Sequence, residues 1–344
     1  MKELFAVDLK GLFRGLYFSI LGTALVFCLF FFAYFLVFNL ITSKPGKVKG
    51  IVERSSLYAD LPVVLYDQVS QEKVENSNSN IPLRDPEIRQ IVLDVYDPQF
   101  VQSNTEKLID GIYGWLMEET SSPQINLDFN EKNKEFANKI GKYAEKRAKE
   151  LPVCGVDRTQ SSEELNVFNV KCLPAHISPA AVRKDIAKAD NTLLDSRLNA
   201  DDIKTNDGRP LHETFANLPK SFSVIKNVPI TLFILALILG GVAIYFSKDI
   251  ISGLKRVSRT VLLAGVLIAL APVIFTYLTK SLLSKASLSD EAINIFRTLS
   301  EEFMRDAGKI YHLSGALFIL IAVGLYVYAK KIERETDKIP KVKS

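Results

Sequence analysis

The chain has 344 residues, of which 48% are hydrophobic and 24% charged, and its formal net charge is +4. These averages combine two compositions, because residues 42–228 carry 25 Lys+Arg and 28 Asp+Glu while the remainder carries 18 and 11. A protein that binds nucleic acid concentrates positive charge on its soluble part. Here the polar part is slightly acidic, so we expect no nucleic-acid partner.

The first long apolar run covers residues 17–41 and contains no Asp, Glu, Lys or Arg. At about 1.5 Å of rise per residue, a helix of this length crosses the ~30 Å hydrocarbon core of a bilayer. The run is far longer than the apolar core of a signal peptide, and Ser43-Lys44-Pro45-Gly46 is not a cleavage site of small residues. We therefore predict an uncleaved span at residues 15–41, after a cytoplasmic N-terminus of residues 1–14.

Three further apolar runs contain no formal charge and have the length of membrane-spanning helices. The spans that they predict cover residues 229–247, 260–279 and 311–329. Within them, Gly240-Gly241, Gly265, Pro272 and Gly315 mark positions where helices pack closely or bend.

The distribution of Lys and Arg in short loops gives the orientation, because cytoplasmic loops are rich in both. Residues 248–259 contain four such residues against one acid, and the tail, residues 330–344, contains six against three. Both are therefore predicted to be cytoplasmic, with residues 42–228 and 280–310 outside. Lys44, Lys47 and Lys49 conflict with this assignment, but long domains cross the membrane largely regardless of charge.

The 42–228 segment is predicted to be a mostly helical extracytoplasmic domain inserted between the first two spans. Asp85-Pro86-Glu87 and Asp97-Pro98 each place an N-cap before a proline at the first helical position. Five helices are expected here: Pro45 to about Val74, Pro86 to Tyr96, Pro98 to Leu116, Asn130 to Leu151, and Pro179 to about Asp190. The first is expected to break at Leu61-Pro62. Short β segments are expected at residues 125–129 and 167–170, and turns at residues 199–210.

Two of the three cysteines, Cys154 and Cys172, fall in this domain, whereas Cys28 lies in the first span as a small apolar packing residue. A pair of cysteines in an oxidising compartment usually forms a disulfide. A metal site would need further ligands, and only His176 is near. We predict a Cys154–Cys172 disulfide and no metal site.

No motif identifies a reaction. H-E-x-x-H, Walker A and G-x-G-x-x-G patterns are absent, so no catalytic residue and no cofactor is predicted. Ser178, His176 and Asp157 can be combined on paper into a hydrolase set, but nothing resembling G-x-S-x-G surrounds the serine. The Asp-rich residues 201–208 lack the spacing and the final Glu of a calcium loop, so a turn is favoured over a weak calcium site.

The outer segment, residues 280–310, is predicted to be a helical hairpin. Ser289 before Asp290-Glu291 is typical of a helix start. An apolar face then follows at helical spacing, formed by Ile293, Phe296, Leu299 and Phe303. We predict that this interaction face packs on the 42–228 domain or on a second copy of the chain.

The layout of one span, a large outer domain and three more spans resembles the permeases of division-associated and lipoprotein-release ABC systems. Those permeases have a longer cytoplasmic segment between spans two and three, which couples to an ATPase, than residues 248–259 provide. The Leu151-Pro152-x-Cys154 and Cys172-x-Pro174 pattern, with four spans, is similar to that of uncharacterised bacterial membrane proteins. This resemblance implies no activity.

The sequence thus predicts a mainly α, multi-pass protein of the cell membrane with both termini in the cytoplasm. We expect a non-enzymatic binding, scaffold or sensing module that acts through its outer domain. Its expected partners are the lipid bilayer and either another envelope protein or a second copy. The alternative is a transport component, such as a small permease or a channel-forming subunit.

Overall fold

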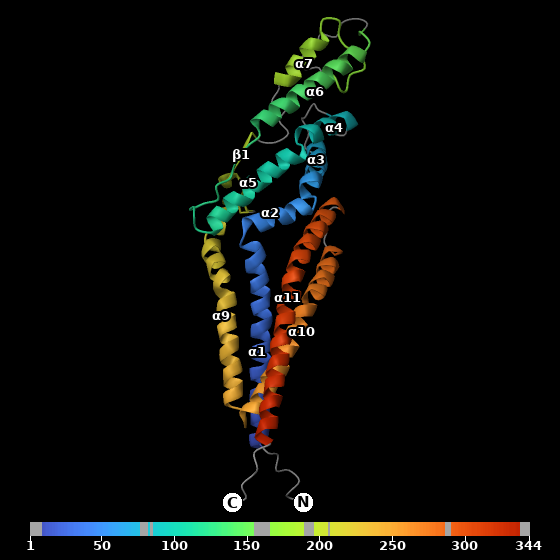
Figure 1. Cartoon of the computed structure of the whole chain (residues 1–344). Helices are drawn as coiled ribbons and strands as arrows, with labels where there is room; N and C mark the ends of the chain where they lie inside the picture. Colours follow the sequence, from blue (N-terminus) through green and yellow to red (C-terminus); the bar gives the residue numbers. More distant parts are fainter. Residues whose placement is uncertain are drawn as a thin grey trace, which may run out of the picture. The chain divides into compact units, whose positions relative to one another are not determined.

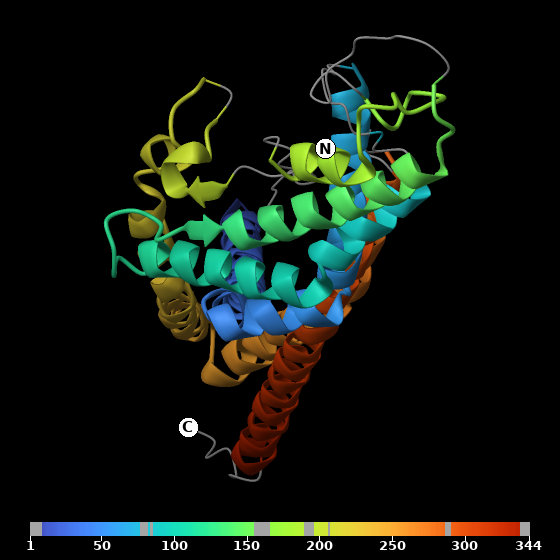
Figure 2. The same cartoon turned by 90° about the horizontal axis from the view of Figure 1, so that it is seen from above.

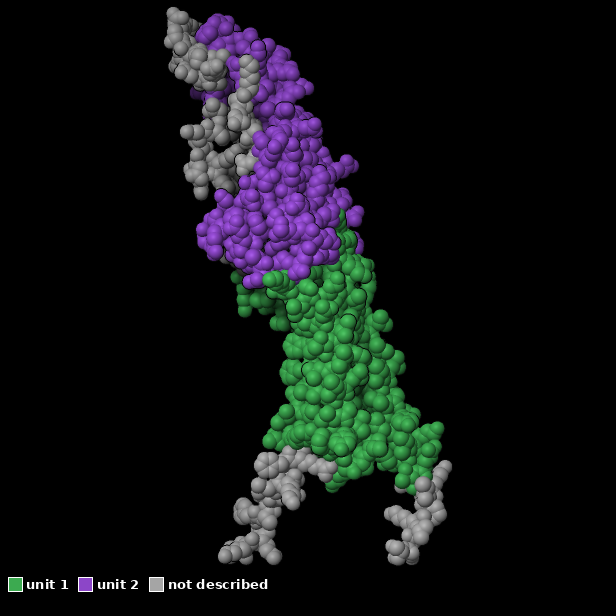
Figure 3. Space-filling view, turned by 90° about the vertical axis from the view of Figure 1, so that its left-hand side faces the viewer, with its two compact units in different colours: residues 1–51, 220–288, 296–344 green, residues 52–219, 289–295 purple. Residues whose placement is uncertain are grey.

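A computed structural model of the chain describes most of its residues (Figure 1). The described residues are 9–75, 82, 85–154, 166–188, 196–205, 207–285 and 290–337. Parts of the two predicted cytoplasmic ends lie outside these residues. Asp157, Asp190, Asn206 and Ser289 also lie outside them. The chain divides into two compact units, which Figure 3 colours separately. Unit 1 consists of residues 1–51, 220–288 and 296–344, and unit 2 of residues 52–219 and 289–295.

Four helices of the described chain are long and apolar enough to cross a membrane. They are α1 (Leu9–Thr42), α9 (Leu218–Tyr245), α10 (Ile250–Leu283) and α11 (Asp290–Asp337), and they make up most of unit 1 (Figure 1). The protein is therefore a mainly helical chain with four candidate membrane spans. The predicted second span is only part of α9, which begins before the apolar run.

The core of unit 1 runs along one face of each long helix. Its buried residues recur at intervals of three and four, which is the spacing of helices that pack nearly parallel to one another. On α1, α10 and α11 they include Leu25, Leu29, Ala33, Val37, Val257, Val261, Ala264, Ile268, Ala271, Ala307, Tyr311, Phe318 and Ala322. Four of the nine on α10 and α11 are alanines, which let these two backbones approach closely.

Gly265 and Gly315 mark the closest approach of α10 and α11. A Cβ atom added to Gly315 would lie 2.8 Å from the carbonyl oxygen of Gly265, a distance that real Cβ atoms do not adopt. Nearby, the buried Ser258 hydroxyl donates across the pair to the Ala322 carbonyl at 2.8 Å. The prediction of close packing at these two glycines is confirmed.

Helix α9 contacts α1 mainly through aromatic rings. Phe233 lies 5.4 Å from Phe32 between ring centroids, and Phe222 lies 6.3 Å from Phe38. The rest of α9 exposes large apolar side chains, among them Ile230, Ile234, Leu237 and Ile238. Exposed apolar surface of this kind suits contact with lipid tails rather than with water.

Unit 2 is built from short helices around an apolar core of its own. Its elements include α3 (Leu57–Glu75), α4 (Pro86–Val95), α5 (Pro98–Leu116), β1 (Asn126–Asp128), α6 (Asn130–Glu150), α7 (Pro179–Lys188), β2 (Arg197–Asn199) and α8 (Leu211–Thr214). Phe136, Ile140 and Ala144 on the buried face of α6 form the centre of the core, with Ile88 and Val92 of α4. Helix α7 lies along α6 (Figures 1 and 2).

The predicted helix starts at Asp85 and Asp97 are confirmed, because each carboxylate caps the helix that follows it. Asp85 also joins two helices. One of its oxygens accepts the Glu87 backbone N–H at 2.8 Å, and the other accepts the hydroxyl of Tyr143 on α6, also at 2.8 Å. Burial, helped by the Asp85 carboxylate, raises the pKa of Tyr143 to about 12.

Two local predictions in unit 2 were wrong. The first helical stretch breaks at Ser55-Ser56, where Ser56 has a φ of 60°, and Pro62 is accommodated inside α3. Residues 167–170 form a turn rather than a strand, with the Val170 N–H donating to the Asn166 carbonyl. The strand β2, which ends at residue 199 where the predicted turns begin and pairs antiparallel with β1, was not predicted.

Candidate functional site

Cys154 and Cys172 form the predicted disulfide, with their Cα atoms 5.1 Å apart. Two backbone hydrogen bonds flank it: the Cys154 N–H donates to the Leu173 carbonyl, and the Leu173 N–H donates to the Pro152 carbonyl, each at 2.9 Å. Leu173 belongs to the core of unit 2. The disulfide therefore fixes the segment after α6 against the segment that leads to α7.

The four residues of the predicted interaction face lie on the first turns of α11, in different environments. Leu299 and Phe303 pack against the core of unit 1. Phe296 is 48% exposed, and Ile293 is half-buried. Two of the four side chains are therefore used within the membrane unit, and Phe296 is the member with the most accessible surface.

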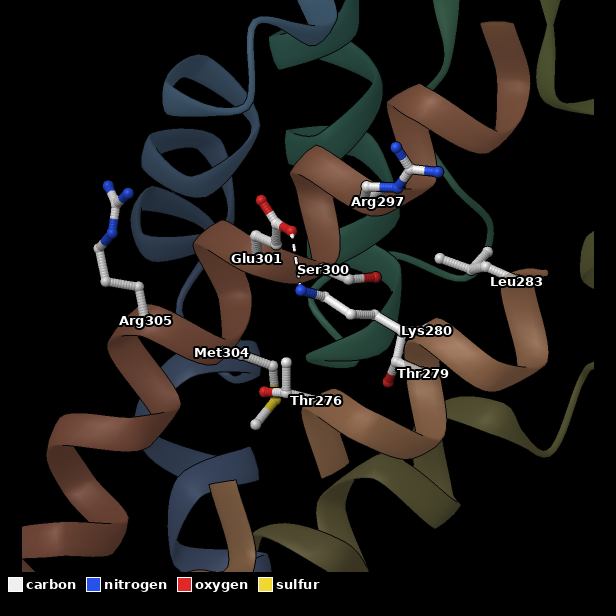
Figure 4. A pocket seen from close by; sticks show the side chains of 9 residues that line it. All are labelled: Thr276, Thr279, Lys280, Leu283, Arg297, Ser300, Glu301, Met304 and Arg305. Atoms are coloured by element: carbon white, nitrogen blue, oxygen red, sulfur yellow. Dashed lines mark ion pairs between the residues drawn. The ribbon is translucent and has the colours of Figure 1, made fainter. Parts of the chain in front are cut away.

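A pocket of about 220 Å³ lies between α10 and α11, near the end of the hairpin that they form (Figure 4). It is lined by Thr276, Thr279, Lys280, Leu283, Arg297, Ser300, Glu301, Met304 and Arg305. On α10 these positions follow spacings of three and four, and on α11 they do the same. Each helix therefore presents one continuous face to the pocket.

The polar groups of the pocket are three cations, one carboxylate and three hydroxyls. The Lys280 ammonium lies 3.8 Å from a Glu301 carboxylate oxygen, and both side chains are more than half exposed. A pair of this kind typically contributes less than about 1 kcal/mol. Arg305 is held more closely, with one guanidinium nitrogen 2.7 Å from the nearly buried carboxylate of Glu302.

Three cations, Lys280, Arg297 and Arg305, line the pocket; against them stand Glu301 and also Glu302, which pairs with Arg305, so one positive charge is in excess. Guanidinium, ammonium and hydroxyl groups are donors that suit phosphate or carboxylate oxygens. The lining of the pocket therefore suits the binding of an anion, and such binding requires no catalytic residue.

The other groups considered from the sequence are used elsewhere. The Ser178 hydroxyl accepts the Ala181 N–H at 3.2 Å as a cap of α7, and Asp157 lies outside the described residues. Asp207 accepts two hydrogen bonds from the Arg209 guanidinium, and Asp202 accepts the Asn199 N–H. Among the residues that the structure describes, no three His, Cys, Asp or Glu side chains gather as a metal site.

Sequence reasoning missed the pocket. Lys280, Arg297 and Arg305 lie in the outer segment, residues 280–310, for which only a helical hairpin with an apolar face was predicted. The available signal was the spacing of Arg297, Glu301 and Arg305, which puts them on one helical face. The register of α10 against α11, which brings Lys280 opposite Glu301, is not readable from either helix alone. No protein family, no curated protein and no solved structure matches the chain.

Proposed function

We propose that this chain is a multi-pass cell-membrane protein of the bacterial envelope and that its residues 42–228 act outside the cytoplasm as a non-enzymatic binding, scaffold or sensing module. The observation that carries the proposal is the Cys154–Cys172 disulfide on a unit with its own apolar core. Disulfides persist in oxidising compartments, and a separate core lets a domain hold a binding surface independently of the spans.

The basic loop and tail support the same orientation. Lys255 pairs with Glu333 at 2.7 Å, which connects the start of α10 to the end of α11. Lys255 and Glu333 belong to the two Lys- and Arg-rich segments, residues 248–259 and 330–344, which the orientation rule assigns to the cytoplasm.

Site-specific photo-crosslinking of the full-length protein in its native membrane tests the binding role. A photoreactive residue at Val153, which is 69% exposed beside the disulfide, is expected to give a discrete adduct with an envelope protein or a second copy. The same residue at exposed Lys331 of α11 is the control on the opposite predicted side. Adducts from Lys331 alone, with an ATPase as the captured protein, would contradict the proposal.

A transport component is the second candidate, and the length of α11 is the observation that favours it. Its 48 residues extend over about 70 Å as one continuous helix, so a movement at one end is transmitted to the other. Against this, carriers commonly break their helices at the midplane or keep ionisable groups there. The four spans are each one unbroken helix, and the apolar runs within them contain no Asp, Glu, Lys or Arg. Ion flux through liposomes that contain the purified protein, above that of empty liposomes, would favour transport.

A further inference from the structure

The pocket between α10 and α11 has no role in the proposed binding module. We propose that it binds the phosphate group of an anionic phospholipid at one surface of the membrane. The proposal requires only that α10 and α11 cross a bilayer, and it is independent of the orientation of the chain and of what unit 2 binds.

The first argument is the level of the pocket along the membrane helix. The apolar run of α10 ends at Leu278, so Lys280 lies about 3 Å and Leu283 about 8 Å farther along the helix. The headgroup layer of a bilayer is about 5–7 Å thick on each side. The pocket residues of α10 therefore pass through the level where lipid phosphates lie.

The second argument is access from the lipid. The Lys280 and Glu301 side chains, which line the pocket, are 61% and 51% exposed, so the pocket is open to its surroundings. Tyr277, Leu278 and Leu282, on the side of α10 away from the pocket, are 74%, 48% and 70% exposed. Tyrosine is enriched where membrane helices leave the hydrocarbon, and exposed leucines at this level suit acyl chains. A lipid bound at this level would have its phosphate beside Lys280, with Met304 available to its apolar part.

The third argument is the match of donors to the ligand. A phosphodiester has a single negative charge and oxygens that accept several hydrogen bonds at once, which Arg, Lys and hydroxyl groups donate. Lys280, Arg297 and Ser300 line one pocket, and Thr279 adds a hydroxyl, whereas the Thr276 hydroxyl already donates to the Pro272 carbonyl. The Lys280–Glu301 separation of 3.8 Å is longer than a hydrogen bond, so the ammonium can turn toward a phosphate without losing a strong interaction.

Lipid titration of the purified full-length protein, followed by native mass spectrometry, tests the proposal. Phosphatidylglycerol is expected to bind more tightly than phosphatidylcholine, and Lys280→Gln or Arg297→Gln is expected to weaken phosphatidylglycerol binding about fivefold. Lys285→Gln is the matched control, because Lys285 is an exposed cation just beyond the end of α10 that does not line the pocket. It is expected to leave the affinity unchanged.

Three results would overturn the proposal. One is equal binding of the two lipids, and another is an equal loss of affinity in the Lys285→Gln control. The third distinguishes the source of the phosphate: if inorganic phosphate raises the melting temperature of the wild type, but not of Lys280→Gln, while lipid has no effect, the pocket binds free phosphate instead.

Discussion

At the start of α5, one Asp97 carboxylate oxygen accepts the backbone N–H groups of Gln99 and Phe100, at 2.9 and 3.0 Å. The hydrogen bond from Phe100, with help from nearby Lys132, lowers the pKa of Asp97 below its ordinary value of 3.8. Because the folded pKa is the lower one, the stability that this carboxylate contributes is complete above pH 3.8. It is lost as the pH falls through the folded pKa.

Unit 2 should therefore unfold more easily in acid, and Asp97 should account for part of the effect. Trp115, the only tryptophan, is 5% exposed in the last turn of α5, so its fluorescence reports unfolding of this unit. We expect Asp97→Ala to cost about 1 kcal/mol at neutral pH. Asp97→Asn keeps the cap and should flatten the fall in melting temperature as the pH drops below about 4. An undiminished fall in that variant would contradict the assignment.

At the scale of the helix, the close approach of α10 and α11 gives a prediction with a matched control. The Cβ of Gly315→Ala would lie within 3 Å of the backbone of α10 and push the two helices apart. We expect the substitution to lower the stability of the detergent-solubilised protein by about 1–3 kcal/mol. Thermal stability measured by size-exclusion chromatography after heating checks this.

Gly324→Ala is the control for Gly315→Ala, because Gly324 lies on the same helix and an added Cβ there meets no atom within 4 Å. Alanine also favours helix over glycine, so this variant should be as stable as the wild type or more stable. If both variants lose stability equally, close packing at Gly315 is not the cause.

The disulfide gives a prediction for the segments that it joins. In the chain-entropy model, closing a loop of 18 residues in sequence separation stabilises the fold by about 3 kcal/mol. Replacing both Cys154 and Cys172 by Ala should lower the melting temperature of unit 2 that Trp115 fluorescence reports. A reducing agent should lower it in the wild type and leave it unchanged in the double variant. Cys28→Ala is the control, since Cys28 lies in α1 and should leave this transition unchanged. A double variant that melts like the wild type would show that the loop is held by its backbone hydrogen bonds.

The same elements show which features local sequence signals could predict. Asp85, Asp97 and the apolar runs act within one or two helical turns, so caps and spans were predicted correctly. The β1–β2 pair was missed because it joins Leu127 to Leu198 across a long stretch of chain and is only three residues long. The break at Ser56 was placed at Pro62 instead, because proline is the stronger local signal for ending a helix. Pro62 remained inside α3, while Ser56 adopted a positive φ that its sequence does not announce.

The pocket was unpredictable for a related reason. Lys280 and Glu301 lie on different helices, and they meet through the register of α10 against α11, which also brings Gly265 and Gly315 close together. The two glycines were recognised as packing sites, yet the sequence does not say which residues of α11 each side chain of α10 faces. Charges that appear balanced along the chain are therefore concentrated at one place in the fold.

At the scale of the whole molecule, the chain separates its compositions: an apolar, basic unit 1 with the four candidate membrane spans, and a polar, acidic unit 2. Six basic residues in the tail and four in residues 248–259, three of which lie in the first turns of α10, oppose the three lysines Lys44, Lys47 and Lys49 that follow α1. Lys44 and Lys47 are exposed at the bend between α1 and α2 (Pro45–Arg54). In either orientation of the chain, the long side chains of Lys44 and Lys47 can reach the lipid phosphates of the nearest leaflet. These lysines therefore do not decide the orientation.

Cysteine labelling decides the orientation of the chain in the membrane. In a chain carrying Cys28→Ala and the intact disulfide, Lys204→Cys introduces one reactive thiol on exposed surface of unit 2, and Lys331→Cys introduces one on exposed surface of α11. A membrane-impermeant maleimide applied to intact cells should label the first and leave the second unlabelled. Both should react after permeabilisation, which controls for accessibility of the thiols. The reverse pattern would place unit 2 in the cytoplasm, where a Cys154–Cys172 disulfide would be reduced. In that case the outer binding module proposed here would be wrong, whereas the lipid pocket between α10 and α11 would stand and face the opposite leaflet.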